Sequence, residues 1–254
     1  MRDLSFGALC VWRRNLESWL PFLGSFLVAA LGNPLLNLGA IGYGLGRFVT
    51  AIDGMPYPAF LAPGLLAATA MYSASFEATF GAYTRLAEQH TYTAILVTPC
   101  SVADVVVGDA LWAATKGLFS TTVLLAVAAV LGLVPHPLAV AVPAVAFLAG
   151  LCFAALGLAV TARAPSYAFF DYYFTLGIGV MFFFSGVFFP LASLPGWAQG
   201  LAWCLPLTHA AALCRALARG DLSPVLLGHL AWLGVVTFLA LLLAERLVRR
   251  RLIV

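Results

Sequence analysis

Charged side chains are scarce in this sequence. Asp, Glu, Lys and Arg together make up 9% of its 254 residues, while 63% of the residues are hydrophobic. In a soluble domain about 25% of the residues are charged, because a protein in water needs polar and charged residues to cover its outside. The composition therefore predicts that the lipid bilayer surrounds most of the chain.

The sequence also lacks the short motifs of nucleotide, zinc and hydrolase sites. Its one lysine, Lys116, is not part of a GxxxxGK[ST] loop, so the chain has no phosphate-binding loop of its own for ATP. HExxH and GxSxG are absent, and the five scattered cysteines have no metal-ligand spacing. We expect no catalytic residue, no metal and no cofactor in this chain. The net charge of +3 is too small to indicate nucleic acid as a partner.

Stretches without Asp, Glu, Lys or Arg indicate the membrane spans, since a bilayer core takes about 20 helical residues to cross. These stretches are Ser18–Gly46, Gly54–Phe76, Gly117–Ala162, Tyr172–Cys214 and Leu222–Ala244. The third is long enough for two helices and is divided by the prolines of Val134–Pro137. The pattern predicts an all-α membrane protein with six transmembrane helices.

Residues 190–210 are too interrupted by proline for a further crossing. A broken segment at membrane depth needs protein partners for its backbone, which is typical of a re-entrant element. We expect a re-entrant helical hairpin between helices five and six, with its tryptophans at headgroup depth. The residues assigned to it are Pro190, Pro195, Trp197, Trp203, Pro206 and His209.

The basic residues predict the orientation. With six crossings, both termini share one side of the membrane with Arg2, Arg13, Arg14, Arg85, Arg163, Arg246, Arg249, Arg250 and Arg251. The other side receives Arg47, Arg215 and Arg219. The positive-inside rule then places both termini in the cytoplasm and the hairpin outside. Residues 1–17 are expected to form an amphipathic helix on the membrane surface.

The longest cytoplasmic loop runs from Gly81 to Asp109. Within it, residues 83–96 place apolar and polar side chains on opposite faces of a helix. One interpretation is a loop lying on the membrane; the other is a short helix presented to a soluble partner, favoured because other cytoplasmic surface is small. The candidate contact residues are Tyr83, Arg85, Leu86, Glu88, Gln89 and Tyr92.

Four ionisable residues, Glu77, Asp109, Lys116 and Asp171, fall near or within the predicted spans. Charges at membrane depth are costly, so such residues either pair with one another or serve transport. Asp109 and Lys116 are seven residues apart on one helical face and are expected to pair through water or another helix. Aromatic residues farther along the chain either face lipid or line an apolar or sugar-stacking path. The candidates for the path are Tyr172, Tyr173, Phe182, Phe183 and Phe184.

Three segments resemble type-2 ATP-binding-cassette (ABC) exporter permeases, in particular the NodJ-type permeases that export nodulation factors, or lipooligosaccharides. They are Phe60–Glu77, Thr84–Gly117 and Phe182–Leu217. The last contains FSG-x-FFP-x-x-x-LP-x-W-x-Q followed by PLTH and RAL. Together with the order of hydrophobic segments, the likeness covers nearly the whole chain as one permease domain, 1–254.

The resemblance implies a homodimer of this chain with two NodI-like ATP-binding subunits, which would bind ATP and Mg. It implies that residues 83–96 are the coupling helix and that the hairpin at 190–210 is extracellular. The implied cargo is an amphiphilic glycolipid, such as a lipid-linked oligosaccharide, exported across the bacterial inner membrane. The alternatives are an ABC permease for a hydrophobic drug or another lipid, an ion-coupled secondary transporter, and an intramembrane aspartyl protease that uses Asp109 and Asp171.

Overall fold

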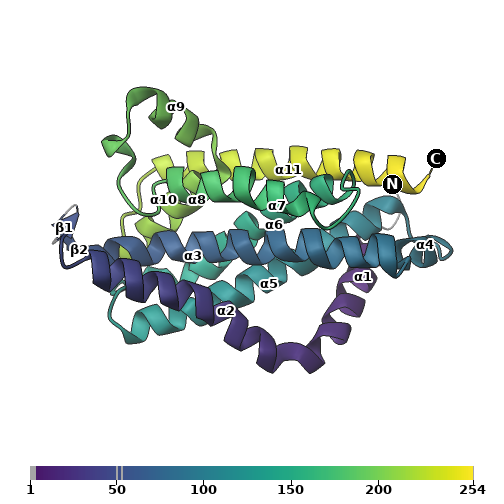
Figure 1. The fold of residues 1–254 in the computed structure, drawn as a ribbon, viewed down its shortest axis with the longest axis horizontal. Coiled ribbons are helices and arrows are strands. Elements are labelled where there is room, and N and C mark those ends of the chain that lie inside the picture. The colour runs from purple at the N-terminus through teal and green to yellow at the C-terminus, as the bar shows by residue number, and fades with distance from the viewer. Residues whose placement is uncertain (1–3, 50, 53, 254) are drawn as a thin grey trace.

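Four long helices set the length of the molecule. α3 (Tyr57–Phe76), α5 (Val102–Val130), α6 (Val142–Thr161) and α11 (Val225–Leu252) run along its long axis (Figure 1). This computed structural model describes residues 4–49, 51–52 and 54–253. α6 packs against the other three. Its Gly157 allows a close approach, because a Cβ there would lie 2.9 Å from the Cβ of Ala78.

α3 is the central helix and continues well beyond Phe76. Every residue from Phe60 to Met71 is buried. Two short π-helical stretches, η3 (Glu77–Gly81) and η4 (Thr84–Glu88), extend the helical backbone to Glu88. The helix then ends, because His90 adopts a left-handed conformation with φ of 50°. The short α4 (Thr91–Leu96) follows.

Four helices of the described residues are long and apolar enough to cross a membrane: Tyr57–Glu88, Val102–Val130, Pro137–Thr161 and Val225–Leu252. A fifth is added if α9 (Gly196–Cys204) and α10 (Pro206–Arg219), which are bent by 86°, form one span. The structure thus confirms an α-helical membrane protein, with a two-stranded hairpin of β1 (Ala51–Ile52) and β2 (Met55–Pro56) as its sheet among the described residues.

The count of six spans stays a prediction. The first predicted span coincides with α2 (Leu23–Asn37) and the π-helical η2 (Leu38–Leu45). The fifth coincides with a shorter apolar helix, Phe169–Phe184, which comprises α7 (Phe169–Tyr172), η6 (Tyr173–Gly179) and α8 (Val180–Phe184). Neither is among the four long spans.

The N-terminal helix α1 (Leu4–Trp19) forms where an amphipathic helix was predicted at 1–17, except that residues 1–3, with Arg2, lie outside the described part. α1 packs on α5 through Ala8, Val11 and Asn15, while Arg13 and Arg14 are exposed. This buried face contacts protein, and the position of α1 on the membrane surface stays a prediction. The 3₁₀ turn η1 (Leu20–Phe22) links α1 to α2.

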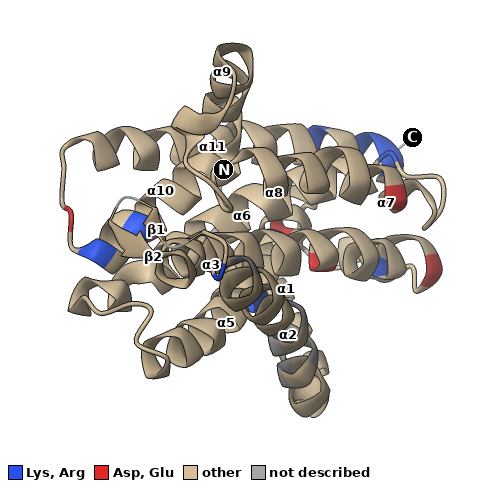
Figure 2. Ribbon diagram, turned by 60° about the vertical axis from the view of Figure 1, so that its left-hand side comes forward, with Lys and Arg blue, Asp and Glu red and all other residues tan. Residues whose placement is uncertain are grey.

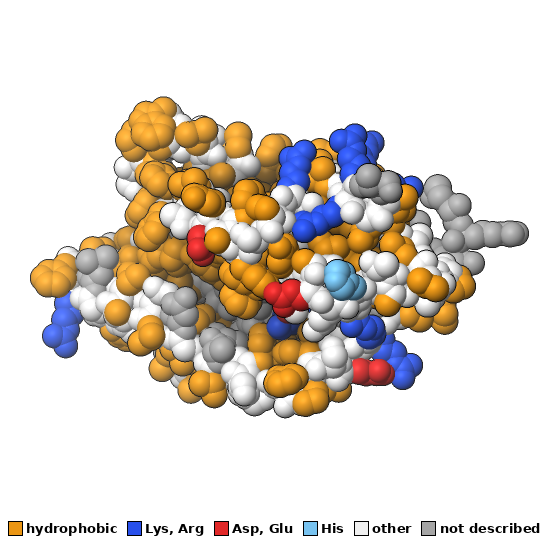
Figure 3. Space-filling model, turned by 45° about the vertical axis from the view of Figure 1, so that its right-hand side comes forward, with side chains coloured by type: hydrophobic (Ala, Val, Ile, Leu, Met, Phe, Trp, Pro, Cys, Tyr) orange, Lys and Arg blue, Asp and Glu red, His pale blue; other side chains and the backbone are white. Residues whose placement is uncertain are grey.

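Both chain termini and α4 lie at one end of the molecule, and the β-hairpin lies at the other (Figure 1). Figure 2 shows charged residues near both ends of the long helices, with uncharged ribbon over most of their length. When the α4 end is turned forward, charged side chains lie in a few separate patches, mostly toward the centre and right, on a largely hydrophobic face (Figure 3). This distribution is typical of helices that cross a bilayer.

The prolines of the second half end and begin its helices. α5 ends at Val130, and the 3₁₀ helix η5 (Pro137–Ala141) leads into α6, as the break at Val134–Pro137 predicted. The turn η7 (Leu191–Ser193) precedes α9, and Pro206 is the first residue of α10.

Candidate functional site

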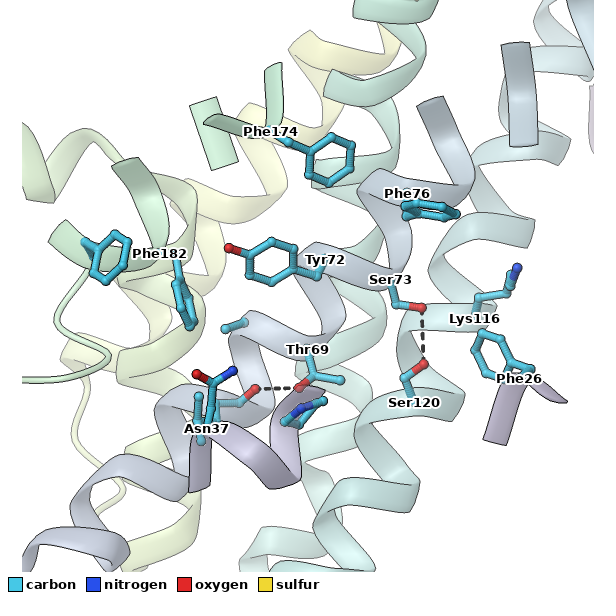
Figure 4. A pocket seen from close by; sticks show the side chains of 14 residues that line it. Phe26, Asn37, Thr69, Tyr72, Ser73, Phe76, Lys116, Ser120, Phe174 and Phe182 are labelled. Atoms are coloured by element: carbon cyan, nitrogen blue, oxygen red, sulfur yellow. Dashed lines mark hydrogen bonds between the residues drawn. The ribbon is translucent and has the colours of Figure 1, made fainter. Parts of the chain in front are cut away.

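A cavity of about 580 Å³ opens between α2, α3, α5 and the Phe169–Phe184 helix. This volume lies within the range of small-molecule sites, about 300–1,000 Å³. Figure 4 shows the lining side chains directed toward the cavity from these elements. They are Phe26, Pro34, Asn37, Leu65, Ala68, Thr69, Tyr72, Ser73, Phe76, Lys116, Ser120, Phe174, Phe182 and Phe183.

α3 supplies one continuous face of this cavity. Its lining residues Leu65, Ala68, Thr69, Tyr72, Ser73 and Phe76 recur every three or four positions, as the residues of a single helical face do. This face was not among the residues predicted from the sequence, although the periodic spacing of its hydroxyl and aromatic residues is a signal that the sequence contains.

The lining combines hydroxyl groups with aromatic rings. Ser73 of α3 and Ser120 of α5 are joined by a hydrogen bond of 3.1 Å between their Oγ atoms. Tyr72 packs edge-on against Phe182, with ring centroids 5.3 Å apart. The rings present apolar faces for stacking, and the hydroxyls offer donors and acceptors. Such a cavity suits a molecule that has both apolar and polar parts.

Two of the predicted path residues line the cavity and three do not. Phe182 and Phe183 are part of the lining. Tyr172 is 67% exposed, Phe184 is also exposed, and Tyr173 packs against the main core. The difference arises from local geometry: residues 173–179 are π-helical, which changes which faces of the aromatic run point inward. A transport role for any of these residues stays a prediction.

Next to the cavity lies a buried cluster of two acids and two bases. Glu77 Oε1 accepts a bond of 2.7 Å from Arg85 Nη1, and its Oε2 accepts one of 2.7 Å from Lys116 Nζ. Arg85 also donates to Asp109 Oδ2 from Nε and Nη2, both at 3.2 Å. The four charges sum to zero, which lowers the cost of burying them.

Neutral groups complete this charge cluster. Asn15 of α1 donates to Asp109 Oδ1 at 2.5 Å, and the Tyr92 hydroxyl donates to Asp109 Oδ2. The Asp109 side chain is 1% exposed. Gly81 provides room, since a Cβ at that position would lie 2.5 Å from Glu77 Oε1. The cluster therefore joins α1, the end of α3, α4 and α5 at one point.

The structure pairs three of the four predicted intramembrane charges. Asp109 and Lys116 are connected through Glu77 and Arg85, which both belong to another helix, one of the two routes that the sequence predicted. Asp171 is exposed on α7 and lies outside the cluster. Because Asp109 is bound by Arg85, Asn15 and Tyr92, it does not form the carboxylate dyad that an aspartyl protease needs.

The predicted helix at 83–96 is divided in the structure. Residues up to Glu88 belong to the long helix, and the short helix is α4, which has six residues. Tyr83, Leu86 and Tyr92 are buried. These residues and Arg85, which was predicted on the exposed polar face, pack within the chain. Exposed side chains remain at Glu88, Gln89, His90, Thr93, Ala94, Val97, Thr98 and Pro99.

Tyr92 anchors α4 to the charge cluster. Burial, reinforced by the neighbouring Asp109 carboxylate, raises the pKa of Tyr92 well above its ordinary value. The phenol therefore keeps its proton and remains a hydrogen-bond donor at neutral pH. After α4, Ser101 and Asp104 form a capping box at the start of α5.

The prolines in 190–210 stand where the helices of the predicted hairpin begin. Trp197 of α9 is 70% exposed, in keeping with a ring that reaches the membrane interface. His209 of α10 is buried and donates from Nε2 to the Trp203 carbonyl at 2.9 Å, and its Nδ1 lies 2.8 Å from Nδ1 of His229. In the described part of the chain, no three His, Cys, Asp or Glu side chains gather as metal ligands would.

The sequence also has a family match and several similar proteins. Residues 8–217 match the family described as ABC-2 type transporter. Nodulation protein J of Rhizobium leguminosarum bv. viciae is 41% identical over 246 residues, which cover 96% of this chain and 94% of that protein. Nodulation protein J of Rhizobium meliloti (strain 1021) is 40% identical over 250 residues, covering 96% of this chain and 93% of that protein.

A third relative gives the same result. Nodulation protein J of Rhizobium leguminosarum bv. trifolii is 39% identical over 250 residues, covering 98% of this chain and 95% of that protein. The family match begins in α1 and ends in α10, so it includes the cavity, the charge cluster and the bent pair α9–α10.

Proposed function

Because this chain belongs to the ABC-2 type transporter family, we propose that it is the membrane permease of an ATP-driven exporter whose cargo is an amphiphilic glycolipid. The observation that carries the proposal is the cavity, in which aromatic rings and hydroxyl groups line one space between apolar helices. Aromatic faces stack on sugar rings and acyl chains, while hydroxyls bond to sugar hydroxyls.

The energy for export would come from separate subunits. We propose that two NodI-like ATP-binding subunits, which hold ATP and Mg, dock on two copies of this chain at the exposed residues around α4. The coupling residues are then Glu88 and Gln89 on the surface, with Tyr83, Arg85, Leu86 and Tyr92 behind them as support. Both termini lie at the α4 end, which in this proposal faces the cytoplasm of a bacterium across its inner membrane.

The names of the relatives and the lining of the cavity together support the proposed cargo class. The relatives are named nodulation proteins, and the cavity has both apolar and hydroxyl-bearing walls. A lipooligosaccharide of the nodulation-factor type offers an acyl chain for the rings and sugars for Thr69, Ser73 and Ser120. A purely hydrophobic drug would make no hydrogen bonds to those hydroxyls, whose present partners belong to the protein: Ser73 and Ser120 bond to each other, and Thr69 donates to the Leu65 carbonyl.

Reconstitution tests the proposal directly. The chain, co-expressed with its ATP-binding subunit, is placed in liposomes, and ATP-dependent movement of a fluorescent lipochitin oligosaccharide is measured. A subunit unable to hydrolyse ATP serves as the control and should abolish transport. Transport that follows a proton gradient without ATP would instead indicate an ion-coupled transporter. Competition by a hydrophobic drug, but not by a glycolipid, would show that the cargo class is wrong.

A further inference from the structure

α3 and α5 face each other along the cavity through two pairs of polar side chains. Ser73 and Ser120 form the hydrogen bond described above. Four residues farther along α3 and four residues back along α5, the Glu77 carboxylate accepts a bond of 2.7 Å from Lys116. The two helices approach closely here, since a Cβ at Gly117 would lie 3.1 Å from a backbone oxygen of α3. One charged pair thus follows directly on the hydroxyl pair of this wall.

Lys116 brings a charge to the surface of the cavity, and Glu77 lies behind it. Of the lining residues that the structure describes, Lys116 is the one with a formal charge. Glu77 is not among them, although it binds Lys116. The two side chains are 15% and 8% exposed. A molecule in the cavity therefore meets the ammonium group first, with the opposite charge on its far side.

The ammonium group of Lys116 retains donors for a ligand. It has three N–H groups, and among the described residues its hydrogen-bond partner is Glu77 Oε2. Its Nζ also lies 5.1 Å from the ring centroid of Phe26 and 5.8 Å from that of Trp112. These rings stabilise the cation but are not hydrogen-bond acceptors of the ordinary kind. Two N–H groups are therefore available to acceptor oxygens of a molecule in the cavity.

The charge of Lys116 is already balanced before a ligand binds. The charge cluster sums to zero, because its two cations are each bonded to a carboxylate. An uncharged ligand leaves this balance as it is. An anionic group beside Lys116 would bring a further negative charge to a site that has no cation in excess. Burying a charge without its own counter-charge is costly.

We propose that Lys116 and Glu77 form a charge filter, in which Lys116 binds the acceptor oxygens of an uncharged head group and Glu77 makes the site disfavour an anionic one. The inference rests on the proposed function and narrows its cargo to glycolipids with an uncharged polar end. Hydroxyl and amide oxygens of sugars are acceptors of the required kind. A bond from a charged donor is stronger than a neutral one, so Lys116 holds the head group more firmly than Ser73 or Ser120 does.

Two forms of one probe test the filter. The first is an uncharged fluorescent lipochitin oligosaccharide, and in the second the hydroxymethyl group of the terminal sugar is oxidised to a carboxylate. Binding to the purified chain in phosphatidylcholine nanodiscs is measured without ATP, as the signal that excess unlabelled compound displaces. We expect the parent to bind the uncharged form at least tenfold more tightly. Glu77→Gln leaves one cation in excess and should bind the carboxylate form at least tenfold more tightly than the parent does.

Two further variants isolate the donor from the charge. Glu77→Gln combined with Lys116→Met removes the donor but keeps the net charge of the cluster at zero. Loss of a bond from a charged donor should weaken binding of the uncharged form about tenfold to hundredfold. The matched control is Glu17→Gln, which removes the same charge from the exposed pair with Arg13. This variant should bind both forms as the parent does.

The outcomes separate this inference from the proposed function. Equal binding of the two forms by the parent would overturn the filter, whether or not a variant folds. Unchanged binding of the uncharged form by the folded double variant would also overturn it, because Lys116 would then not hold the head group. If the parent binds neither form, the cargo class is wrong and the filter with it. Selective binding without ATP-driven transport would count against the proposed function alone.

Discussion

Glu77 divides its two carboxylate oxygens between two cations, Arg85 and Lys116, and Arg85 in turn reaches Asp109. A hydrophobic core of the same volume would be at least as stable as such a buried network in many proteins. Its position between α4 and the cavity gives a reason for its presence. Lys116 lines the cavity, and Tyr92 of α4 bonds to Asp109, so the cluster connects the two.

The balance of charge in this cluster leads to a prediction about stability. Arg85→Met leaves two carboxylates with one lysine, and breaking a buried pair in this way costs about 3–5 kcal/mol. We expect the midpoint of thermal unfolding in detergent to fall markedly. Adding Asp109→Asn restores neutrality and should recover part of the loss. Double-variant unfolding curves measure this recovery.

An exposed ion pair supplies the control. Arg13 and Glu17 form a salt bridge of 2.7 Å with side chains 76% and 58% exposed. Pairs of this kind contribute about 0–1 kcal/mol, so Arg13→Met should change stability little. If Arg85→Met were equally harmless, the cluster would not be buried as the structure describes.

The cavity leads to a second prediction at the residue scale. Tyr72 lines the cavity, while Tyr172, a path residue predicted from the sequence, is largely exposed. An aromatic contact contributes about 0.5–1.5 kcal/mol, so Tyr72→Ala should weaken cargo binding by about threefold to tenfold. Tyr172→Ala should leave it unchanged. For each variant, the affinity for cargo is measured by adding increasing amounts of glycolipid and following the stimulation of ATP hydrolysis by the partner subunit. If Tyr172→Ala weakened binding and Tyr72→Ala did not, the cargo path would lie along the exposed side of α7 instead of in the cavity.

At the scale of elements, α4 shows where helix periodicity alone is insufficient. Tyr83 to Leu96 has the spacing of one amphipathic helix, but the backbone at His90 is left-handed and divides the segment. What holds α4 in place is Tyr92, through a bond to Asp109, seventeen residues along the chain. Periodicity in a short window gives no information about that distant partner.

Tyr92→Phe isolates this anchor. The ring stays in the core, but the buried Asp109 carboxylate loses one donor, at a cost of about 1–3 kcal/mol. We expect the amides of α4 to exchange hydrogen faster and ATP hydrolysis to become less effective in driving transport. Hydrogen exchange by mass spectrometry and the ratio of cargo moved to ATP hydrolysed measure these effects. Tyr172→Phe, at an exposed phenol, is the control, and equal exchange in both variants would contradict the anchoring role.

The features that the sequence predicted well are those that depend on local composition. The apolar stretches, the break at Val134–Pro137 and the capping box at Ser101 depend on local chemistry and are visible in one sequence. The buried position of Arg85 and the inner face of α3 depend on which helices become neighbours. Contacts such as Arg85 with Asp109 or Arg215 with Gly186 arise from packing, which local patterns do not encode.

At the scale of the whole molecule, the proposed export depends on how the chain is oriented in the membrane. Both termini and α4 lie at one end (Figure 1), and this end has the basic cluster Arg246, Arg249, Arg250 and Arg251 of α11. Positive residues are retained on the cytoplasmic side of membrane proteins. In the proposed function, an ATP-binding partner at α4 and the predicted hairpin α9–α10 therefore lie on opposite faces of the membrane.

Cysteine accessibility tests this arrangement in intact cells. With the exposed native cysteines replaced, Trp197→Cys on α9 should react with an impermeant reagent from outside, because Trp197 is 70% exposed at the end remote from α4. Arg250→Cys should react only after the membrane is opened, because the positive-inside rule predicts that the basic end of α11 lies inside. If both sites react from the same side, α9 cannot be the outer hairpin. Cargo passing the Phe182 rings would then return to the compartment from which it came, and the chain could not export it.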